Sequence, residues 1–444
     1  MRRTPTFSRR ARVAVAAAAL GPALAGIAAL GPPAAGAAGT TLFVDNRNPA
    51  CTDSGTGTAS APFCTIRRAA AVAVAGQTVS VAPGTYGGDI TPARSGTSGA
   101  PITYVPSSGP VTIQGGTNGF KLSGRSFITI GLFTITGTTG NGIEVSSSTA
   151  IVFVANRVIS AGSPADGRTA YGFDLEGTTG CVFIWNTADH NSDAGFKFDD
   201  HSDTNLLVAN AAHDNARGYV RAAAGFDVRD SAGNVLVNNV SHDNEDSGFN
   251  IWTGSSGTQL TNAVSYGNGD HGIDVHSAAN AVVVANTVYG NVDSGIEVTT
   301  STNTRIANNI SADNGINSPR TSGNLRVDSN SAAGTSVDDD LVFLRVGGVM
   351  VDWAGKQYSS LAAFQSAIGK ETHGRQGDPR FVGPSSANFR LRSDSAAIDG
   401  ANSGAPSQPG NDAAGASRFD DPATPNTGRG PISYADRGAF EYRP

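Results

Sequence analysis

The chain has 444 residues, enough for a large core or for two to three domains, and its net charge is −6 at pH 7. Charged residues make up only 15%, 56 residues are glycine, and short Val, Ile, Leu and Phe runs alternate with Gly, Asn, Ser and Thr. This pattern predicts many short strands and turns, and therefore an all-β protein. An acidic chain without a basic stripe excludes a nucleic-acid partner.

Residues 1–37 have the pattern of a secretory signal peptide. Five arginines precede an apolar run from Val13 to Leu30, and small residues then lead to a cleavage point near Ala37 or Ala38. An adjacent arginine pair leaves Sec and twin-arginine export both open. A retained membrane helix is the alternative, although Pro22 interrupts the run. We expect a secreted, extracellular protein without membrane attachment once the signal is removed.

Residues 38–77 are expected to form an N-terminal cap. Cys51 and Cys64 bracket a loop rich in Gly, Ser and Thr. In an oxidising compartment, a disulfide between them would stabilise this otherwise weak segment. The third cysteine, Cys181, lies in a strand-like run, and we expect a buried thiol there.

From residue 78 to residue 337 the sequence repeats with a period of about 23 residues. Tetrapeptides that begin with glycine return at Gly142, Gly172, Gly195, Gly225, Gly248, Gly272 and Gly295. A column of asparagines has the same period, at Asn191, Asn215, Asn244, Asn268, Asn291 and Asn314. A period in the low twenties predicts a parallel β-solenoid, here of about eleven coils, with the asparagines as a ladder at a turn.

Residues 338–444 lack this period and are expected to form a C-terminal cap on the last coils. The stretch "SSLAAFQSAIG" predicts one helix, and short strands are expected among loops rich in Pro, Gly and Asp. A separate sugar-binding domain is the alternative, although few aromatic residues cluster there.

Strand alternation places the second and fourth residues after each repeat glycine outside the solenoid, where they form two columns. The first column is Glu144, Asp174, Lys197, Asp227, Asn250, Asp274 and Glu297. The second is Ser146, Glu176, Asp199, Arg229, Trp252, His276 and Thr299. An exposed tryptophan among polar groups is suited to stack on a sugar ring. We therefore expect Trp252, His276, Asp199 and the nearby His201 to bind a glycan.

Two inserted segments flank the coil of Lys197. "SAGSPADGRTAY" precedes the strand at Gly172, and "ARGYVRAAA" precedes the strand at Gly225. Long loops on a regular scaffold are often functional, so these are expected to wall a cleft. The structural alternative is that Lys197 only relieves repulsion between stacked acids. Asp193, two residues before its glycine, is equally well explained as a turn residue.

These tetrapeptides and the asparagine column resemble the right-handed parallel β-helix, or pectin-lyase-like, superfamily. The stretch "GFKF" at Gly195 is similar to the family-nine pectate lyases. This resemblance implies an N-terminal cap with a short helix around Ile66 to Ala75, and Lys197 as a catalytic base. The calcium ligands that it implies are Asp174, Asp193 and Asp227. The chain departs from that family before the repeat glycine, where Tyr171, Ala194 and Ala224 replace an expected aspartate.

The implied reaction is β-elimination on an acidic, uronic-acid-containing polysaccharide by a monomeric enzyme. It requires a cation or an arginine to neutralise the substrate carboxylate, for which Arg229 is the candidate, and a base that is neutral when it acts. A glycoside hydrolase is the second hypothesis. Asp174 and Asp227, two coils apart, would be separated by about 9.6 Å, which suits inversion. The third hypothesis is a non-catalytic secreted solenoid that binds polysaccharide.

Overall fold

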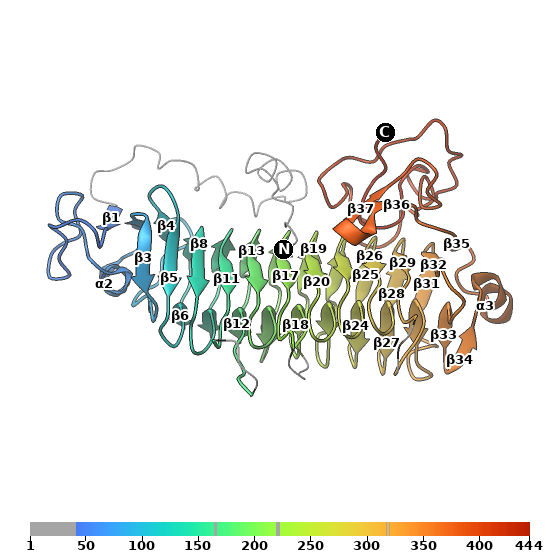
Figure 1. Ribbon diagram of the computed structural model, residues 1–444, viewed down its shortest axis with the longest axis horizontal. Coiled ribbons are helices and arrows are strands. Elements are labelled where there is room, and N and C mark those ends of the chain that lie inside the picture. Colours follow the sequence, from blue (N-terminus) through green and yellow to red (C-terminus); the bar gives the residue numbers. More distant parts are fainter. Residues whose placement is uncertain (1–40, 164–166, 219–222, 317, 319) are drawn as a thin grey trace.

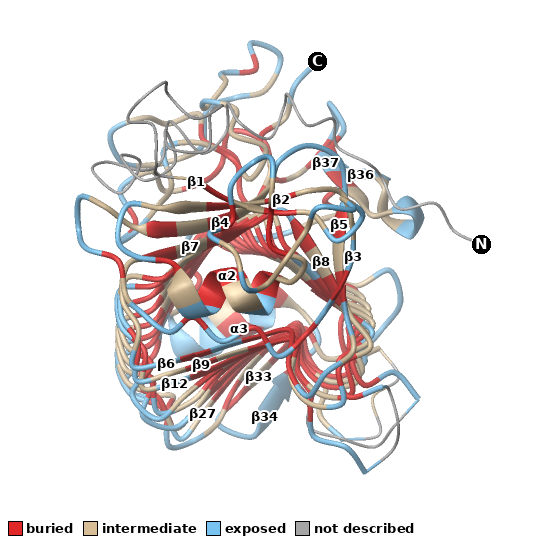
Figure 2. Cartoon of the chain, turned by 90° about the vertical axis from the view of Figure 1, so that its left-hand side faces the viewer, coloured by how far each residue is buried: buried red, intermediate tan, exposed pale blue. Residues whose placement is uncertain are grey.

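The structure is a computed structural model, and it describes residues 41–444 except 164–166, 219–222, 317 and 319. The expected signal peptide lies outside the described residues. Three long sheets form the walls of one elongated solenoid with a roughly triangular cross-section (Figures 1 and 2). Their parallel strands confirm the predicted all-β, right-handed parallel β-helix.

Sheet A contains β1 (Thr41–Val44), β2 (Thr78–Val81), β4 (Ile102–Pro106), β7 (Ile128–Gly131), β10 (Val152–Val154), β13 (Val182–Ile184), β16 (Leu206–Val208), β19 (Val235–Val237), β22 (Gln259–Thr261), β25 (Val282–Val284), β28 (Arg305–Ala307) and β31 (Ser336–Asp338). Sheet B contains β3 (Gly84–Gly87), β5 (Val111–Gln114), β8 (Phe133–Thr136), β11 (Arg157–Ile159), β14 (Thr187–Asp189), β17 (Ala211–His213), β20 (Val240–His242), β23 (Val264–Tyr266), β26 (Thr287–Tyr289), β29 (Ile310–Ala312), β32 (Leu341–Phe343) and β35 (Arg375–Gln376).

Sheet C contains β6 (Phe120–Ser123), β9 (Ile143–Ser146), β12 (Phe173–Glu176), β15 (Phe196–Asp199), β18 (Phe226–Val228), β21 (Phe249–Ile251), β24 (Ile273–His276), β27 (Ile296–Thr299), β30 (Leu325–Val327), β33 (Val351–Trp353) and β34 (Lys356–Tyr358). Within this sheet β34 pairs antiparallel with β33, whereas the other pairs are parallel. The strands of the three sheets thus extend beyond both ends of the range 78–337 in which the sequence period is visible.

Inward-facing side chains stack from coil to coil along the core. Phe173, Phe196, Phe226 and Phe249 form one column of nearly parallel rings, with centroids 4.7, 4.8 and 4.9 Å apart. These are the first residues after the repeat glycines, so the predicted inward positions are confirmed. Cys181 is fully buried, as expected.

Two asparagine ladders satisfy the buried turns of the solenoid. The predicted ladder is present. From Asn191 to Asn291, each side-chain NH2 group donates to the side-chain oxygen of the next asparagine in the column at 2.9–3.0 Å. A second ladder, between sheets A and B, was not predicted, and it includes Asn156, Asn186, Asn210 and Asn239. Buried polar groups need such partners, so these ladders fix the coil-to-coil register.

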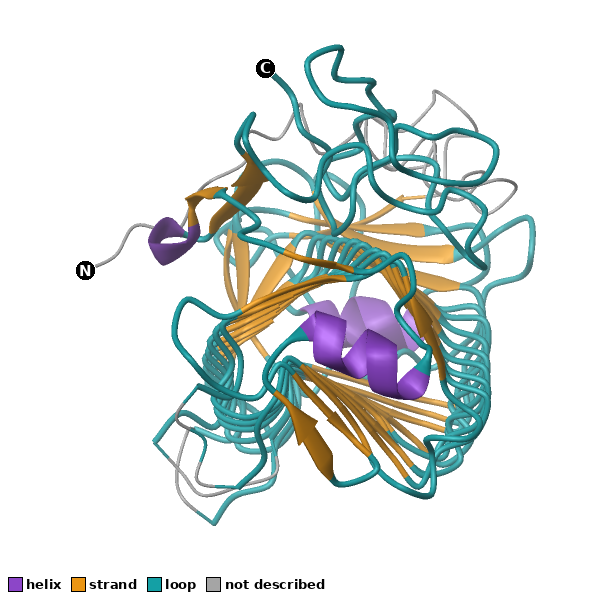
Figure 3. Ribbon diagram, turned by 90° about the vertical axis from the view of Figure 1, so that its right-hand side faces the viewer, coloured by secondary structure: helices purple, strands orange, loops and turns teal. Residues whose placement is uncertain are grey.

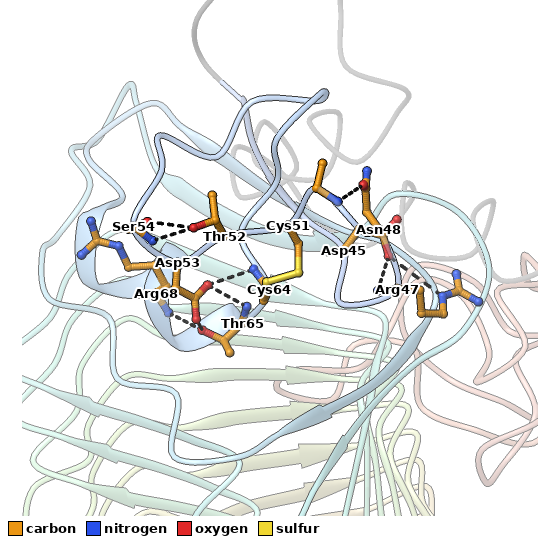
Figure 4. The surroundings of a disulfide bond; sticks show 11 residues. Asp45, Arg47, Asn48, Cys51, Thr52, Asp53, Ser54, Cys64, Thr65 and Arg68 are labelled. Carbon is orange, nitrogen blue, oxygen red and sulfur yellow. Dashed lines mark hydrogen bonds and ion pairs between the residues drawn. A yellow bond between two sulfur atoms is a disulfide. The ribbon is translucent and has the colours of Figure 1, made fainter.

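Helices close both ends of the solenoid. The predicted N-terminal helix is α2 (Ile66–Val72), whose Thr65 side chain accepts a hydrogen bond from the Arg68 N–H, and Figure 2 shows it across one end. The Cys51–Cys64 disulfide is present beside it, and Asp53 joins this loop to Thr65 (Figure 4). At the other end lies α3 (Leu361–Ile368), the predicted C-terminal helix (Figure 3).

The last part of the chain folds back over the outside of the later coils (Figure 1). It contains the 3-10 helix η2 (Pro384–Ser386) and a hairpin of β36 (Phe381–Gly383) and β37 (Asn388–Leu391). Asn308 donates to the carbonyl oxygen of Asn402 at 2.8 Å, and Arg429 pairs with Asp339 at 2.6 Å. In the part of the chain that the structure describes, no helix is long and apolar enough to cross a membrane.

We predict that Asn210→Ala lowers the free energy of unfolding by about 2–4 kcal/mol, because it removes the hydrogen bonds of the second ladder to both neighbouring coils. The Asn210 amide donates to Asn239 and to the Phe183 carbonyl oxygen, and its oxygen accepts from the Asn186 N–H. Urea unfolding followed by circular dichroism measures the loss. Asn426→Ala, at an exposed position, is the control. Equal stability of the two variants would contradict this role of the ladder.

Candidate functional site

The outward columns of sheet C have the register that the repeat predicts. Asp174 pairs with Lys197, Lys197 with Asp227, Asp227 with Asn250, and Asn250 with Asp274. Although these side chains point away from the core, the four acids and amides are buried, with exposed fractions between 0% and 6%. Asn141, from the preceding turn, donates to Asp174, and Arg229 and Trp252 of the second column donate to Asp227 and Asp274. The face is therefore a layered polar surface in which only the upper layer is open to solvent.

Lys197 lies in the centre of this surface on β15. Its Nζ is 3.4 Å from Asp199 Oδ2, 3.7 Å from Asp174 Oδ1 and 4.0 Å from Glu176 Oε1, and 15% of its side chain is exposed. Burial raises the pKa of Asp174 to about 6, although the Lys197 charge opposes this shift. The lysine thus balances an acidic pocket while one part of it remains accessible.

Tyr171 is a site residue that the sequence reasoning did not identify. Its ring lies over the Lys197 ammonium, with 4.8 Å between Nζ and the ring centroid. Burial raises the pKa of Tyr171, and the carboxylates of Asp193 and Asp174 raise it further. The sequence does mark this residue. The position before the repeat glycine is tyrosine only here, whereas the other repeats have Asn, Ala, Ser or His there.

Arg229 forms the next part of the surface. Its Nε donates to both carboxylate oxygens of Asp227 at 2.8 Å. Burial nevertheless raises the pKa of Asp227 to about 6, because the loss of hydration outweighs the attraction of the guanidinium. The guanidinium also lies over the ring of Trp252, 4.3 Å from its centroid.

Trp252 is therefore not the exposed platform that the sequence suggested. It is half-buried, Arg229 lies over its ring, and its Nε1 donates to Asp274 Oδ2 at 2.7 Å. The ring centroid of His276 is 5.7 Å away, and His276 Nδ1 is 2.8 Å from Thr299 Oγ1. Both polar contacts of the indole are thus made within the protein, and Arg229 occupies one face of its ring.

The remaining predicted residues lie around this centre. His201 is exposed in the turn after β15, and its backbone N–H donates to the Asp230 carbonyl oxygen. Asp193 accepts a hydrogen bond from the N–H of Ala194, as an aspartate in a turn does. Parts of both inserted segments lie outside the described residues, so the walls that we expect from them remain a prediction.

Three groups of His and Asp residues in the described part of the chain bring ligand atoms within 4.8 Å of one another and so could hold a metal ion. They are Asp189, His190 and His213; Asp270, His271 and Asp293; and Asp338, Asp339 and His373. Asp174, Asp193 and Asp227 do not form such a group. Lys197 instead lies 3.7 Å from Asp174, and Arg229 pairs with Asp227 at 2.8 Å.

A model of the Pel9A-like right-handed beta-helix region matches residues 46–317, more than half of the chain. The chain belongs to this family. Among solved structures, pectate lyase Pel9A is 17% identical, with 91% of this chain and 96% of that chain covered and a TM-score of 0.50.

XylC, solved in complex with xylose, is 14% identical, with 61% and 69% covered and a TM-score of 0.51. The Dettilon tailspike protein is 14% identical, with 70% and 64% covered and a TM-score of 0.51. At these identities the likeness shows the fold alone. No curated protein matches the chain.

We predict that Trp252 fluorescence changes with a midpoint near pH 6. Burial raises the pKa of Asp274 to about 6, so below that pH the acceptor of the indole N–H becomes neutral. The signal is the difference between the parent protein and Trp252→Phe over pH 4–8. Asp274→Asn, which keeps an oxygen acceptor but does not titrate, is expected to remove the step. A step of unchanged size and midpoint in that variant would contradict the assignment.

Proposed function

We propose that this protein is a secreted polysaccharide lyase that cleaves a uronic-acid-containing glycan by β-elimination on sheet C, with Lys197 as the base. The observation that carries the proposal is the pairing of a partly accessible lysine with an arginine in the next coil of the same face. These are the two functions that the reaction requires: a group that takes the C5 proton and a cation for the substrate carboxylate. The family supports an action on glycans but does not select the substrate.

Arg229 has the geometry to bind the substrate carboxylate. Both of its hydrogen bonds to Asp227 come from Nε, so its two terminal NH2 groups remain for a ligand. The stacking contact with Trp252 fixes the plane of the guanidinium. A bidentate pair with the uronate would withdraw electron density from C5 and make its proton more acidic.

Lys197 and Tyr171 are placed to move the protons. Lys197, as the neutral amine, accepts the C5 proton; the C5–H electrons form the C4–C5 double bond, and the C4–O4 bond breaks. The departing O4 takes a proton from the phenol of Tyr171, whose raised pKa keeps it protonated until that step. The base must act as the neutral amine, and amines are largely protonated at neutral pH, so we expect activity to increase as the pH rises above neutrality.

Calcium has no step in this proposal. In related chemistry, the ion would neutralise the substrate carboxylate, but here the expected ligands face Lys197 and Arg229 instead. We therefore expect a chelator to leave the activity unchanged. A requirement for calcium would show that a group other than Arg229 binds the carboxylate.

The hydrolase hypothesis is less well supported by the geometry. It needs Asp174 and Asp227 as an acid and a base on either side of a glycosidic bond. Both are almost fully buried, and Arg229 Nε contacts both oxygens of Asp227. Asp174 accepts a hydrogen bond from Asn141 and faces Lys197, so each carboxyl group would have to give up a contact within the protein to reach a substrate oxygen or a water.

The proposal is tested with a panel of uronans, and the ultraviolet absorbance of the C4–C5 double bond is the readout. We expect Lys197→Met to reduce the rate at least about a thousandfold, because the base is lost, while the melting temperature stays nearly unchanged. Lys121→Met is the matched control. Lys121 occupies the same outward position three coils earlier, pairs with Glu144 at 2.8 Å, and is expected to be dispensable.

Two outcomes would contradict the proposal. Activity that survives Lys197→Met would show that Lys197 is not the base. New reducing ends without the double bond would indicate hydrolysis.

A further inference from the structure

A pocket of about 330 Å³ lies away from sheet C, at the seam between the solenoid and the C-terminal part of the chain. The solenoid contributes residues from the ends of three successive strands of sheet B: Tyr289, Asp313, Phe343 and Arg345. The C-terminal segment contributes Asp378, Pro379, Arg380, Phe381, Pro384 and Arg392. Its volume is within the usual range for small-molecule sites.

The aromatic wall of the pocket is built where the β36–β37 hairpin packs on the solenoid (Figure 1). Phe381 lies edge-on to Tyr289, with ring centroids 5.8 Å apart, and Phe389 contacts Tyr289 at 5.5 Å. In the strand register, the small Ala312 lies between Tyr289 and Phe343. Ala312 itself is fully buried, in one apolar cluster with Phe381 and Phe389. Tyr289 and Phe343 remain partly exposed, as rings that stack on a ligand must be.

Three arginines surround this wall, against two aspartates among the lining residues. The exposed Arg392 guanidinium donates to the Val382 carbonyl oxygen at 2.9 Å, a contact that leaves its charge for a ligand. Arg345 pairs with Asp313 at 3.4 Å. Arg380 pairs with Asp378 and with the exposed Asp394, each at 3.4 Å.

The two ion pairs of Arg380 are long and exposed on both sides, so each contributes little to stability. Arg345, in contrast, pairs with the buried Asp313. A carboxylate of a ligand can therefore replace the aspartate partners of Arg380 at small cost, and guanidinium groups are suited to bind it in bidentate fashion. Partly exposed rings beside arginines match an anionic sugar, because the ring stacks on its apolar face and the guanidinium binds its carboxylate.

We propose that this seam pocket is a second, non-catalytic binding site for a uronate unit of an acidic polysaccharide. It lies on sheet B, four to six coils from the coil of Lys197, or roughly 19–29 Å along the solenoid axis. Two sites on one rigid body increase the apparent affinity for a long polymer, because the second contact is intramolecular. The inference is independent of the chemistry on sheet C, since binding needs no catalysis.

The test uses calorimetric titration with trigalacturonate, and maltotriose serves as the neutral probe. The parent protein carries Lys197→Met and Arg229→Ala, which remove turnover and the sheet C carboxylate contact. We expect it to bind trigalacturonate at one site. Adding Arg380→Ala and Arg392→Ala is expected to weaken that binding at least about tenfold. Arg390→Ala is the matched control, because Arg390 lies on the same hairpin but faces Phe440 instead of the pocket.

A second, milder variant shows whether weaker binding could come from a folding defect. Arg392→Gln changes an exposed side chain and is expected to weaken binding about threefold with an unchanged melting temperature. Unaltered binding in both pocket variants would overturn the proposal, and so would equal binding of maltotriose. A separate assay distinguishes this proposal from the lyase proposal. Pocket variants that retain Lys197 and Arg229 are expected to form unsaturated product from short substrates at the same rate as the unmodified protein, because the pocket takes no part in the reaction.

Discussion

The structure depends on the in-register stacking of parallel coils. Each residue of a repeat lies beside its equivalent in the next coil, so any side chain at a given position meets the same kind of neighbour along the axis. This arrangement stabilises apolar positions, as the stacked rings from Phe173 to Phe249 show. It also stabilises asparagine, because the side-chain amide can donate a hydrogen bond to one neighbour in the stack and accept one from the other. Charged positions do not, since like charges would lie about 4.8 Å apart.

The chemistry of sheet C follows from this constraint. In the first outward column, Lys197 separates Asp174 from Asp227, and the neutral Asn250 separates Asp227 from Asp274. In the second column, Arg229 bonds back to Asp227 and lies over Trp252. Charge balance and a functional role are therefore compatible, because a cation that separates stacked acids is also a cation that can contact a uronate. The same logic explains why the expected calcium ligands already have partners.

The sequence predicted those features that the repeat itself specifies. The columns, the inward phenylalanines, the first asparagine ladder and the Cys51–Cys64 disulfide were read from spacing, composition or resemblance, and the structure has them. It did not predict the burial of Asp174 and Asp227, because burial depends on which side chains of the turns fold over them. Tyr171 was seen only as a departure from a family pattern, since a column position does not tell where a long ring will lie. Sheet C also continues to Tyr358, after the sequence period has faded, because strand pairing tolerates turns of unequal length.

The central claim is that the protein removes the C5 proton of a uronate with Lys197. The most direct measurement is the kinetic isotope effect on cleavage of an oligouronate that carries deuterium at C5. Our account predicts that the labelled substrate is cleaved severalfold more slowly, and that each cleavage yields a C4–C5 double bond. Cleavage at the same rate for both substrates, with reducing ends but no double bond, would contradict it.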